Sequence, residues 1–267
     1  NTTLPRPTGA LQAKQLMVRA SGSDATILQS LDFSLPAGAM LTVLGPSGSG
    51  KSTLARVLAG ALAPTRGELA LDGAALHQYA DAVRGPATGY LPQDVQLHSG
   101  SIAHNIARQW GGTEALSDED NAQVIAAAKL AAAHELITSL PKGYDTLLGS
   151  GPDTHTLSGG QLQRIALARA VFGNLSLVIL DEPNSQLDAE GEAALEGCLH
   201  ALRERRATVV VVTHRPHLIE LSSHVLVLRA GQTEQFGPRE QVRQWMIQRN
   251  QAAMKNRASH ADISSAK

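Results

Sequence analysis

The sequence predicts an α/β fold in which buried, parallel-type strands alternate with helices and a helical segment is inserted into the core. Two observations predict the core. Short apolar runs at residues 40–44, 177–180 and 209–212 have the length and composition of strands that are covered on both faces. A glycine-rich loop and then a helical pattern follow the first run, in the order of a strand–loop–helix unit. A third observation, alanine-rich sequence between about residues 93 and 158, predicts the helical insertion.

Length and composition limit the classes of protein that fit. A chain of 267 residues, 43% of them hydrophobic, suits one large α/β domain or a core with an inserted subdomain. The 23 basic and 24 acidic side chains nearly cancel, so the overall charge gives no reason to expect nucleic acid as a partner. The one cysteine, Cys198, excludes an internal disulfide, and its apolar neighbours at helical spacing predict a core residue. No apolar run reaches 18 residues, so no membrane-spanning helix is predicted.

The elements of the first third follow from local patterns. Residues 1–10 are rich in proline and threonine and are predicted to be a linker. The chain begins at Asn1 rather than at methionine, so we expect a piece of a longer polypeptide. Short strands are expected from about residue 11 to residue 35, where apolar residues recur at near-alternate positions. The next predicted elements are a strand at 40–44, a helix at about 50–62 that ends near Pro64, and strands at 69–71 and 88–91.

The rest of the chain contains the insertion and the return to the core. Ser117 begins Ser-Asp-Glu-Asp, a helix N-terminus with acids at the positive end of the helix dipole, and Pro141-Lys142-Gly143 closes the alanine-rich segment. We therefore expect one domain over residues 11–237 with a helical subdomain at about 93–160. The polar tail, 238–267, is expected to be helical in its first half and disordered over its last ten residues. The remaining predicted elements are helices at about 160–172 and 188–205 and strands at 177–180, 209–212 and 225–228.

The phosphate-binding P-loop pattern is matched in full by Gly45-Pro46-Ser47-Gly48-Ser49-Gly50-Lys51-Ser52, with Thr53 directly after it. Glycines allow the chain to turn so tightly that several backbone N–H groups point into one concavity, and the helix N-terminus adds partial positive charge. Lys51 supplies a full charge for the β- and γ-phosphates, and the Ser52 hydroxyl can ligate Mg²⁺. The strand before the loop and the helix after it are the setting that this motif requires.

An apolar run that ends in two acids predicts the metal ligand and the base. Residues 177–180 run directly into Asp181 and Glu182. In open α/β sheets the carboxyl ends of the strands form the ligand-binding edge, so both side chains are expected at the nucleotide. Asp181 is predicted to hold Mg²⁺ or its water, and Glu182 to orient and polarise the attacking water. Without the P-loop, the same two acids would be interpreted as a solvated strand end.

The pentapeptide Leu157-Ser158-Gly159-Gly160-Gln161 resembles the signature motif of ATP-binding-cassette (ABC) proteins. Physically it is a second anion site, because a serine and two glycines that open a helix offer a hydroxyl and backbone N–H donors to a phosphate. The resemblance extends over about residues 11–237. It implies a P-loop NTPase (RecA-like) core, an N-terminal antiparallel β subdomain and an inserted helical subdomain that carries the signature. It also implies a head-to-tail homodimer in which each ATP lies between the P-loop of one copy and the signature of the other.

Three further motifs resemble those of the same family in their order and spacing. Gln93, in Tyr90-Leu91-Pro92-Gln93, looks like the Q-loop glutamine, which implies contact with Mg²⁺ or the attacking water. Asp188 closes Ser185-Gln186-Leu187-Asp188, which is similar to the D-loop that reaches across the dimer. His214, after the valine strand, looks like the H-loop histidine that contacts the γ-phosphate. Together with Glu182, Gln93 and His214 are the catalytic residues that the resemblance implies.

A narrower resemblance is to the type I secretion ATPases of Gram-negative bacteria, which export proteases, lipases and S-layer proteins. It is carried by residues 4–9, 89–95, 101–106, 140–146 and 180–185. It implies six membrane helices ahead of the ATPase on the same natural chain, with residues 1–10 as the linker after them. It also implies a place on the cytoplasmic face of the bacterial inner membrane, with a membrane fusion protein and an outer-membrane channel as partners.

Two positions depart from the exporter pattern. Exporters usually have an aromatic residue near positions 18–20 that stacks on adenine, but Val18, Arg19 and Ala20 stand there, and Phe33 lies too near the P-loop to replace it. Because base–aromatic stacking contributes about 1–3 kcal/mol, we predict weak selectivity for the base. Ser150 stands where the loop before the signature normally carries a glutamate, which weakens any inference about how this loop meets a membrane domain.

Two rival classes contain the same cassette. ABC importers carry it on a separate chain, and soluble ABC ATPases act in DNA repair and translation. The exporter-like stretch through Tyr144-Asp145-Thr146 argues against an importer. Soluble members usually have long coiled-coil insertions or tandem cassettes, whereas this chain has one cassette and a short insertion. The prediction is therefore ATP hydrolysis that powers one-step protein export, with an importer subunit or a soluble ATPase as the alternatives.

Overall fold

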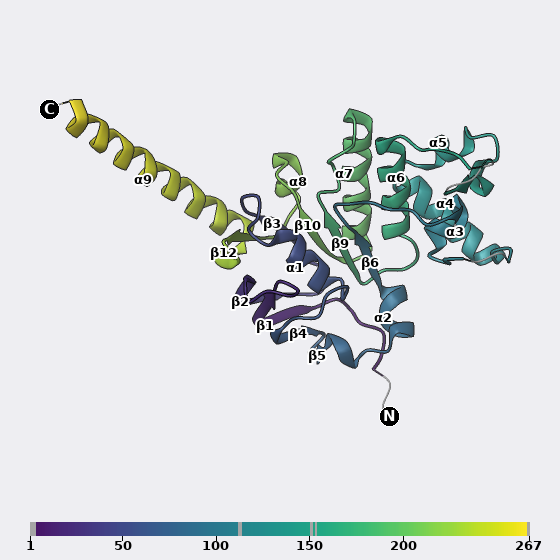
Figure 1. The fold of residues 1–267 in the computed structure, drawn as a ribbon, viewed down its shortest axis with the longest axis horizontal. Coiled ribbons are helices and arrows are strands. Elements are labelled where there is room, and N and C mark those ends of the chain that lie inside the picture. Colours follow the sequence, from purple (N-terminus) through teal and green to yellow (C-terminus); the bar gives the residue numbers. More distant parts are fainter. Residues whose placement is uncertain (1–3, 112–113, 150–151, 153, 266–267) are drawn as a thin grey trace.

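The structure is a computed structural model that describes residues 4–111, 114–149, 152 and 154–265, with side chains up to residue 252. Its centre is a six-stranded sheet in the order β12-β11-β3-β10-β9-β6 (Figure 1). Five strands run parallel, and the edge strand β12 pairs antiparallel with β11. The strands of this sheet are β3 (Met40–Leu44), β6 (Thr88–Leu91), β9 (Leu177–Asp181), β10 (Thr208–Val212), β11 (His224–Arg229) and β12 (Gln232–Pro238).

Strand β10 shows why a run of four valines is buried on both faces. Successive side chains of a strand point to opposite faces of the sheet. Val209 and Val211 therefore pack in the core on one face, while Val210 and Val212 pack in the core on the other. Helices α6 (Gly159–Ala170) and α7 (Ala189–Glu204) cover the first face, and α1 (Lys51–Leu58) covers the second. Cys198 of α7 is fully buried in the first core, as predicted.

The N-terminal strands form a second sheet, as the sequence predicts. Its order is β2-β1-β4-β5, and all of its pairings are antiparallel. Its apolar side chains join those of α1 in a single core, so the sheet and the central sheet enclose α1 between them. The strands are β1 (Leu11–Arg19), β2 (Thr26–Leu35), β4 (Arg66–Leu71) and β5 (Ala74–Ala75).

The helical insertion also forms, beside α6 and α7 (Figure 1). Helix α4 (Asp118–Leu130) begins where the acidic N-terminus predicts, because the Ser117 hydroxyl accepts a hydrogen bond from the Asp120 N–H at 3.0 Å. The alanine-rich run is interrupted at Ala132, whose φ is 49°, so a separate helix α5 (His134–Thr138) follows. The insertion is completed by α3 (Ile102–Ala107) and by the paired short strands β7 (Gly100–Ser101) and β8 (Leu147–Leu148). This arrangement confirms the predicted fold class.

Several elements differ from the prediction. Helix α1 ends at Leu58 rather than near residue 62, because Gly60 reverses the chain with φ 72°. Helix α9 (Arg239–Ser265) extends well into the segment that the sequence is expected to leave disordered (Figure 1). Residues 240–265 contain no glycine or proline and many strong helix formers, which favours this extension. The sequence reading also missed β12 and the short helices α2 (Asp81–Ala87) and α8 (Pro216–Glu220).

Within the described residues, no helix combines the length and the apolar character needed to cross a bilayer. Three predictions fall wholly or partly outside these residues. They concern Ser150 in the loop before the signature, the first three residues of the expected linker and the last two residues of the expected disordered tail.

Candidate active site

The glycine-rich loop lies between the carboxyl end of β3 and the start of α1. Two of its glycines are required by their surroundings. Gly45 has φ 155°, and a Cβ there would lie 2.3 Å from the carbonyl oxygen of Leu228. Gly50, the N-cap of α1, has φ 97°, and a Cβ there would lie 2.6 Å from the Leu28 side chain. The loop is thus held against β11 and β2 in a conformation that only glycine adopts easily.

Lys51 is the first residue of α1, and its ammonium group folds back over the loop. The side chain is buried, and Nζ donates hydrogen bonds to the carbonyl oxygens of Gly45 and Pro46, at 2.8 and 2.9 Å. Because an ammonium group has three N–H donors, one remains for a ligand. The positive charge therefore already lies at the concavity in which a phosphate would bind.

Asp181 is the last residue of β9 and Glu182 follows it; this strand lies in the sheet between β10 and β6. Asp181 is 1% exposed, and its Oδ1 has no hydrogen-bond partner among the described residues. Burial raises the pKa of Asp181, and the charges of Glu182 and Asp94 add to the rise, while Ser52 and Lys51 lower it. A buried carboxylate oxygen without a partner, close to a serine hydroxyl, is the kind of oxygen ligand that Mg²⁺ takes. The residues present therefore fit the predicted metal.

A chain of hydrogen bonds joins the P-loop helix to the second acid. The Ser52 hydroxyl donates to Gln93 Oε1 at 3.3 Å, and Gln93 Nε2 donates to Glu182 Oε2 at 3.1 Å. Gln93 can reach both groups because it follows β6, the strand that pairs directly with β9. These three residues line a cavity of about 270 Å³. Its other lining residues are Ile27, Ser47, Gly48, Gly50, Lys51, Thr53 and His214.

The predicted signature opens α6 as an exposed helix N-terminus. The Ser158 hydroxyl accepts from the Gln161 N–H at 3.3 Å, and the Ser158 N–H donates to Gln161 Oε1 at 2.9 Å, so the two residues form a capping box. Ser158, Gly160 and Gln161 line a second cavity, of about 200 Å³, with Asp188. A Cβ at Gly159 would lie 2.3 Å from Gln186 Oε1, so the signature and the segment before α7 approach closely.

Asp188 is held within its own chain. Its Oδ1 accepts from the Gly191 N–H at 2.8 Å, which caps α7, and from Arg164 of α6 at 2.9 Å. These hydrogen bonds, first that from Gly191 and then that from Arg164, lower the pKa of Asp188. The sequence predicts for Asp188 only a role across the dimer, and no motif identifies Arg164 as its partner.

The structure divides the predicted site residues into two groups. Gln93, Glu182 and His214 gather at the P-loop, whereas Ser158, Gly160 and Gln161 lie with Asp188 around the other cavity. No lining residue is common to the two cavities. A phosphate at the P-loop and a phosphate at the signature of one chain would therefore occupy separate sites.

The sequence reading missed Ile27, the apolar residue that lines the P-loop cavity. None of the eight aromatic residues of the chain, all of which the structure describes, lines that cavity. Phe33 is buried against Phe236, with ring centroids 5.8 Å apart, and is not available to a base. The alternation of apolar residues over 27–35 predicts the strand, but it carries no signal that Ile27 would face a ligand.

Comparison with known proteins agrees with this fold. The sequence model of the ABC transporter family matches residues 28–185. The chain therefore belongs to the ABC transporter family, and it is an ABC ATPase domain. It is 43% identical to the type I secretion system ATP-binding protein PrsD of Rhizobium meliloti (strain 1021), over 95% of this chain and 42% of that protein.

Two other relatives extend the comparison. The ATP-dependent lipid A-core flippase of Haemophilus influenzae (strain 86-028NP) is 38% identical over 86% of this chain and 38% of that protein. The structure of a bacterial Atm1-family ABC exporter with ATP bound superposes with a TM-score of 0.75 at 32% identity, over 90% of this chain and 40% of that one. The chain thus spans about two fifths of the length of these relatives.

Proposed function

We propose that this chain binds MgATP at its P-loop cavity and hydrolyses it between two head-to-tail copies, and that hydrolysis powers an exporter. The hydrogen-bond chain from Ser52 through Gln93 to Glu182 carries the proposal. It connects the hydroxyl expected at Mg²⁺ with the carboxylate expected at the water, in the cavity that also contains Lys51 and His214. These are the parts that phosphoryl transfer requires, since it depends on positioning and on neutralisation of charge.

Each residue has a distinct task in this mechanism. The backbone N–H groups of the P-loop and the ammonium of Lys51 bind the β- and γ-phosphates. Ser52, Asp181 and Gln93 would hold Mg²⁺, which supplies positive charge to the phosphate oxygens when bound. Glu182 orients the attacking water and polarises it, because Gln93 fixes one of its oxygens and no group of the described residues is hydrogen-bonded to the other. His214 is exposed at the rim of the cavity and contacts the γ-phosphate.

The head-to-tail dimer follows from the separation of the two anion sites. The signature helix presents its N-terminus to solvent at Ser158 and Gly159, away from the P-loop cavity of its own chain. A helix N-terminus binds anions through its free N–H groups and its dipole. A second copy that places this terminus over the first copy's nucleotide would supply the missing donors and exclude water from the site.

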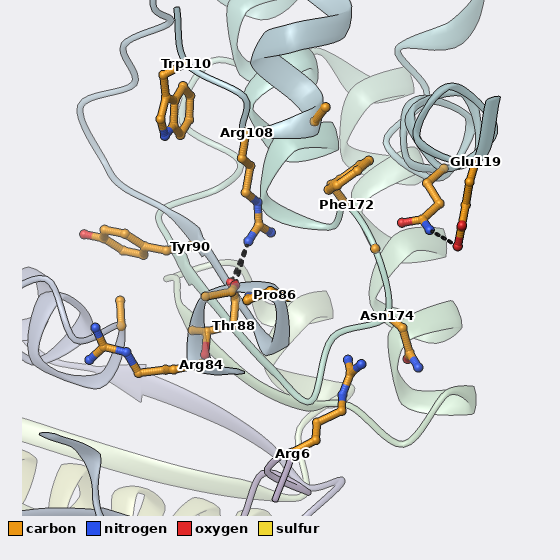
Figure 2. A pocket seen from close by; sticks show the side chains of 15 residues that line it. Arg6, Arg84, Pro86, Thr88, Tyr90, Arg108, Trp110, Glu119, Phe172 and Asn174 are labelled. Carbon is orange, nitrogen blue, oxygen red and sulfur yellow. Dashed lines mark hydrogen bonds between the residues drawn. The ribbon is translucent and has the colours of Figure 1, made fainter. Parts of the chain in front are cut away.

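A surface near Gln93 is the proposed docking site of the membrane domain. A cavity of about 770 Å³ lies where the insertion meets the core (Figure 2). An adjoining cavity includes Pro92 and Asp94, the two neighbours of Gln93. Figure 2 shows Tyr90, Trp110 and Arg108 around the first cavity, so apolar rings would face an incoming segment. Movement of such a segment would reach the Q-loop directly.

The exporter proposed is of the type I, protein-secreting kind, at the cytoplasmic face of the bacterial inner membrane. Identity of 43% to a type I secretion protein over nearly the whole chain supports it. The membrane domain would be part of the same natural polypeptide, and a membrane fusion protein and an outer-membrane channel would complete the system. The lipid A-core flippase relatives, at up to 38% identity, favour lipid export as the second candidate.

Two experiments test these proposals. Glu182→Gln should bind ATP normally, lose turnover and accumulate as an ATP-bound dimer in size-exclusion chromatography. Near-normal turnover in this variant would remove Glu182 from the role of base. For the exporter, we would express the complete natural gene and its neighbours in a bacterium that lacks them. Secretion of a neighbour-encoded protein that depends on Lys51 supports protein export, whereas lipid transfer without protein secretion supports the second candidate.

A further inference from the structure

The second turn of the signature helix contacts the segment that follows the proposed base. Gln163 of α6 is 2% exposed, and its Nε2 donates to the backbone carbonyl of Pro183 at 3.0 Å in a buried hydrogen bond. Pro183 comes directly after Glu182. A buried amide that is fixed in this way has little freedom, since every alternative orientation would leave the carbonyl without a donor. The hydrogen bond therefore fixes the backbone next to Glu182.

Glu182 needs such fixing, because its backbone adopts an unusual conformation. Its φ is 48°, in the left-handed region that residues other than glycine seldom adopt. This conformation persists only where the surrounding structure determines it. On one side, the Glu182 N–H donates to the carbonyl of Val212 at 2.9 Å. On the other side, the carbonyl of Pro183 is held by Gln163.

The same helix also holds the far end of this segment. Arg164, next to Gln163, donates to Asp188 at 2.9 Å, and its side chain is only 13% exposed. Between these two contacts, the Thr213 hydroxyl donates to Asn184 Oδ1 at 3.1 Å. Hydrogen bonds from α6 therefore hold both ends of the segment from Glu182 to Asp188, and the N-terminus of α6 is the proposed anion site.

We infer that Gln163 is a positioning residue for Glu182, which it acts on through the carbonyl of Pro183. The inference rests on the proposed role of Glu182 as the base. Helix α6 would then have two roles in one chain. Its first turn offers N–H donors to the nucleotide bound by the partner copy, and its second turn positions Glu182 at the nucleotide bound by its own chain. A shift of α6 when its N-terminus binds the partner's phosphate would therefore move the Glu182 carboxylate at the chain's own site.

The test is a set of variants of the full chain in which kcat, KM for ATP and the thermal midpoint are measured. Gln163→Met keeps the length of the side chain and removes the donor. We expect kcat to fall about 10- to 100-fold, the range found for small misplacements of a catalytic group. KM for ATP should stay within about twofold, since the P-loop contacts are untouched. Gln244→Met, on the exposed part of α9, is the matched control and should leave both constants unchanged.

Gln163→Glu separates positioning from packing. A protonated carboxyl can donate to the Pro183 carbonyl, whereas a carboxylate cannot. The ratio of its kcat to that of the wild type should therefore rise as the pH is lowered, while the ratio for Gln163→Met stays flat. Wild-type kcat in Gln163→Met, or equal slopes for the two variants, would overturn the inference. Turnover retained in Glu182→Gln would overturn the proposed function and this inference with it.

Discussion

Replacing Arg108 by methionine should destabilise the fold markedly, although Arg108 forms no ion pair among the described residues. Its guanidinium donates to the carbonyls of Thr88 at 2.8 Å, Arg169 at 3.0 Å, Gly85 at 3.2 Å and Ala170 at 3.3 Å. These carbonyls belong to α2, to the start of β6 and to the end of α6, so one side chain joins the insertion to the core (Figure 2). Burial, and then the charge of Arg169, lowers the pKa of Arg108 to about 10.

The magnitude follows from the hydrogen bonds. A hydrogen bond to a charged group contributes about 1.5–3 kcal/mol. Counting only the two shorter bonds, at the low end of this range, gives about 3 kcal/mol. For a chain of this size, about 2–4 °C of thermal midpoint is lost per kcal/mol, so a fall of about 6–12 °C is expected.

The assay is thermal and urea unfolding followed by circular dichroism, with Arg19→Met as the control. Arg19 forms an exposed ion pair with Asp24 at 3.6 Å, and such pairs contribute about 0–1 kcal/mol. The control variant should therefore unfold within about 2–4 °C of the wild type. If Arg108→Met unfolds at the same temperature as Arg19→Met, the four carbonyl contacts do not stabilise the junction and the reasoning is wrong.

Four further predictions concern the nucleotide base, Ile27, the Cys198 thiol and Asp188 of the D-loop. GTP should be hydrolysed with a kcat/KM within about tenfold of that for ATP. No aromatic side chain of the P-loop cavity is available to stack on the base, so the contribution of about 1–3 kcal/mol that stacking makes is missing. A strict preference for ATP in steady-state assays would contradict this prediction. Ile27→Ala should raise KM for both nucleotides alike and leave the binding of inorganic tripolyphosphate unchanged, as measured by calorimetry. Burial raises the pKa of the Cys198 thiol to about 12, so the reactive thiolate is scarce in the folded chain. Iodoacetamide at pH 8.5 should therefore label only unfolded protein. Labelling of the native chain would show that the core opens. The lowered pKa of Asp188 implies a contribution to stability that is full above about pH 4 and is lost as the pH falls through the lowered pKa. In urea unfolding, Asp188→Asn should therefore weaken the dependence of stability on pH at acid pH. An unchanged dependence in this variant would refute the prediction.

Much of the fold could be predicted because its signals are local. The valines of β10 and the apolar residues before Asp181 identify buried strands through composition alone. Strand β12 could not be predicted in this way, because its sequence is mostly polar and it forms as an edge strand through pairing with β11. The break at Ala132 was also missed, since alanine favours helix and the left-handed turn there depends on packing around it.

The candidate site shows the same limit. The P-loop and the two acids at the end of β9 are each continuous in sequence, so their motifs identify them. Gln163 and Arg108 act through backbone carbonyls of distant segments, and a carbonyl carries no residue identity. No motif could therefore connect these side chains with Pro183 or Thr88. The assignment of catalytic roles to Gln93, Glu182 and His214 stays a prediction, which Glu182→Gln tests for Glu182.

The hydrogen bonds of Lys51 have a consequence for experiments on nucleotide affinity. Its ammonium donates to the carbonyls of Gly45 and Pro46, and these hydrogen bonds stabilise the shape of the loop. Any movement of the ammonium toward a phosphate must exchange them for new hydrogen bonds. Substitution of Lys51 therefore changes the P-loop itself as well as its complex with nucleotide. An affinity lost in such a variant measures the difference between two altered states rather than the strength of one contact.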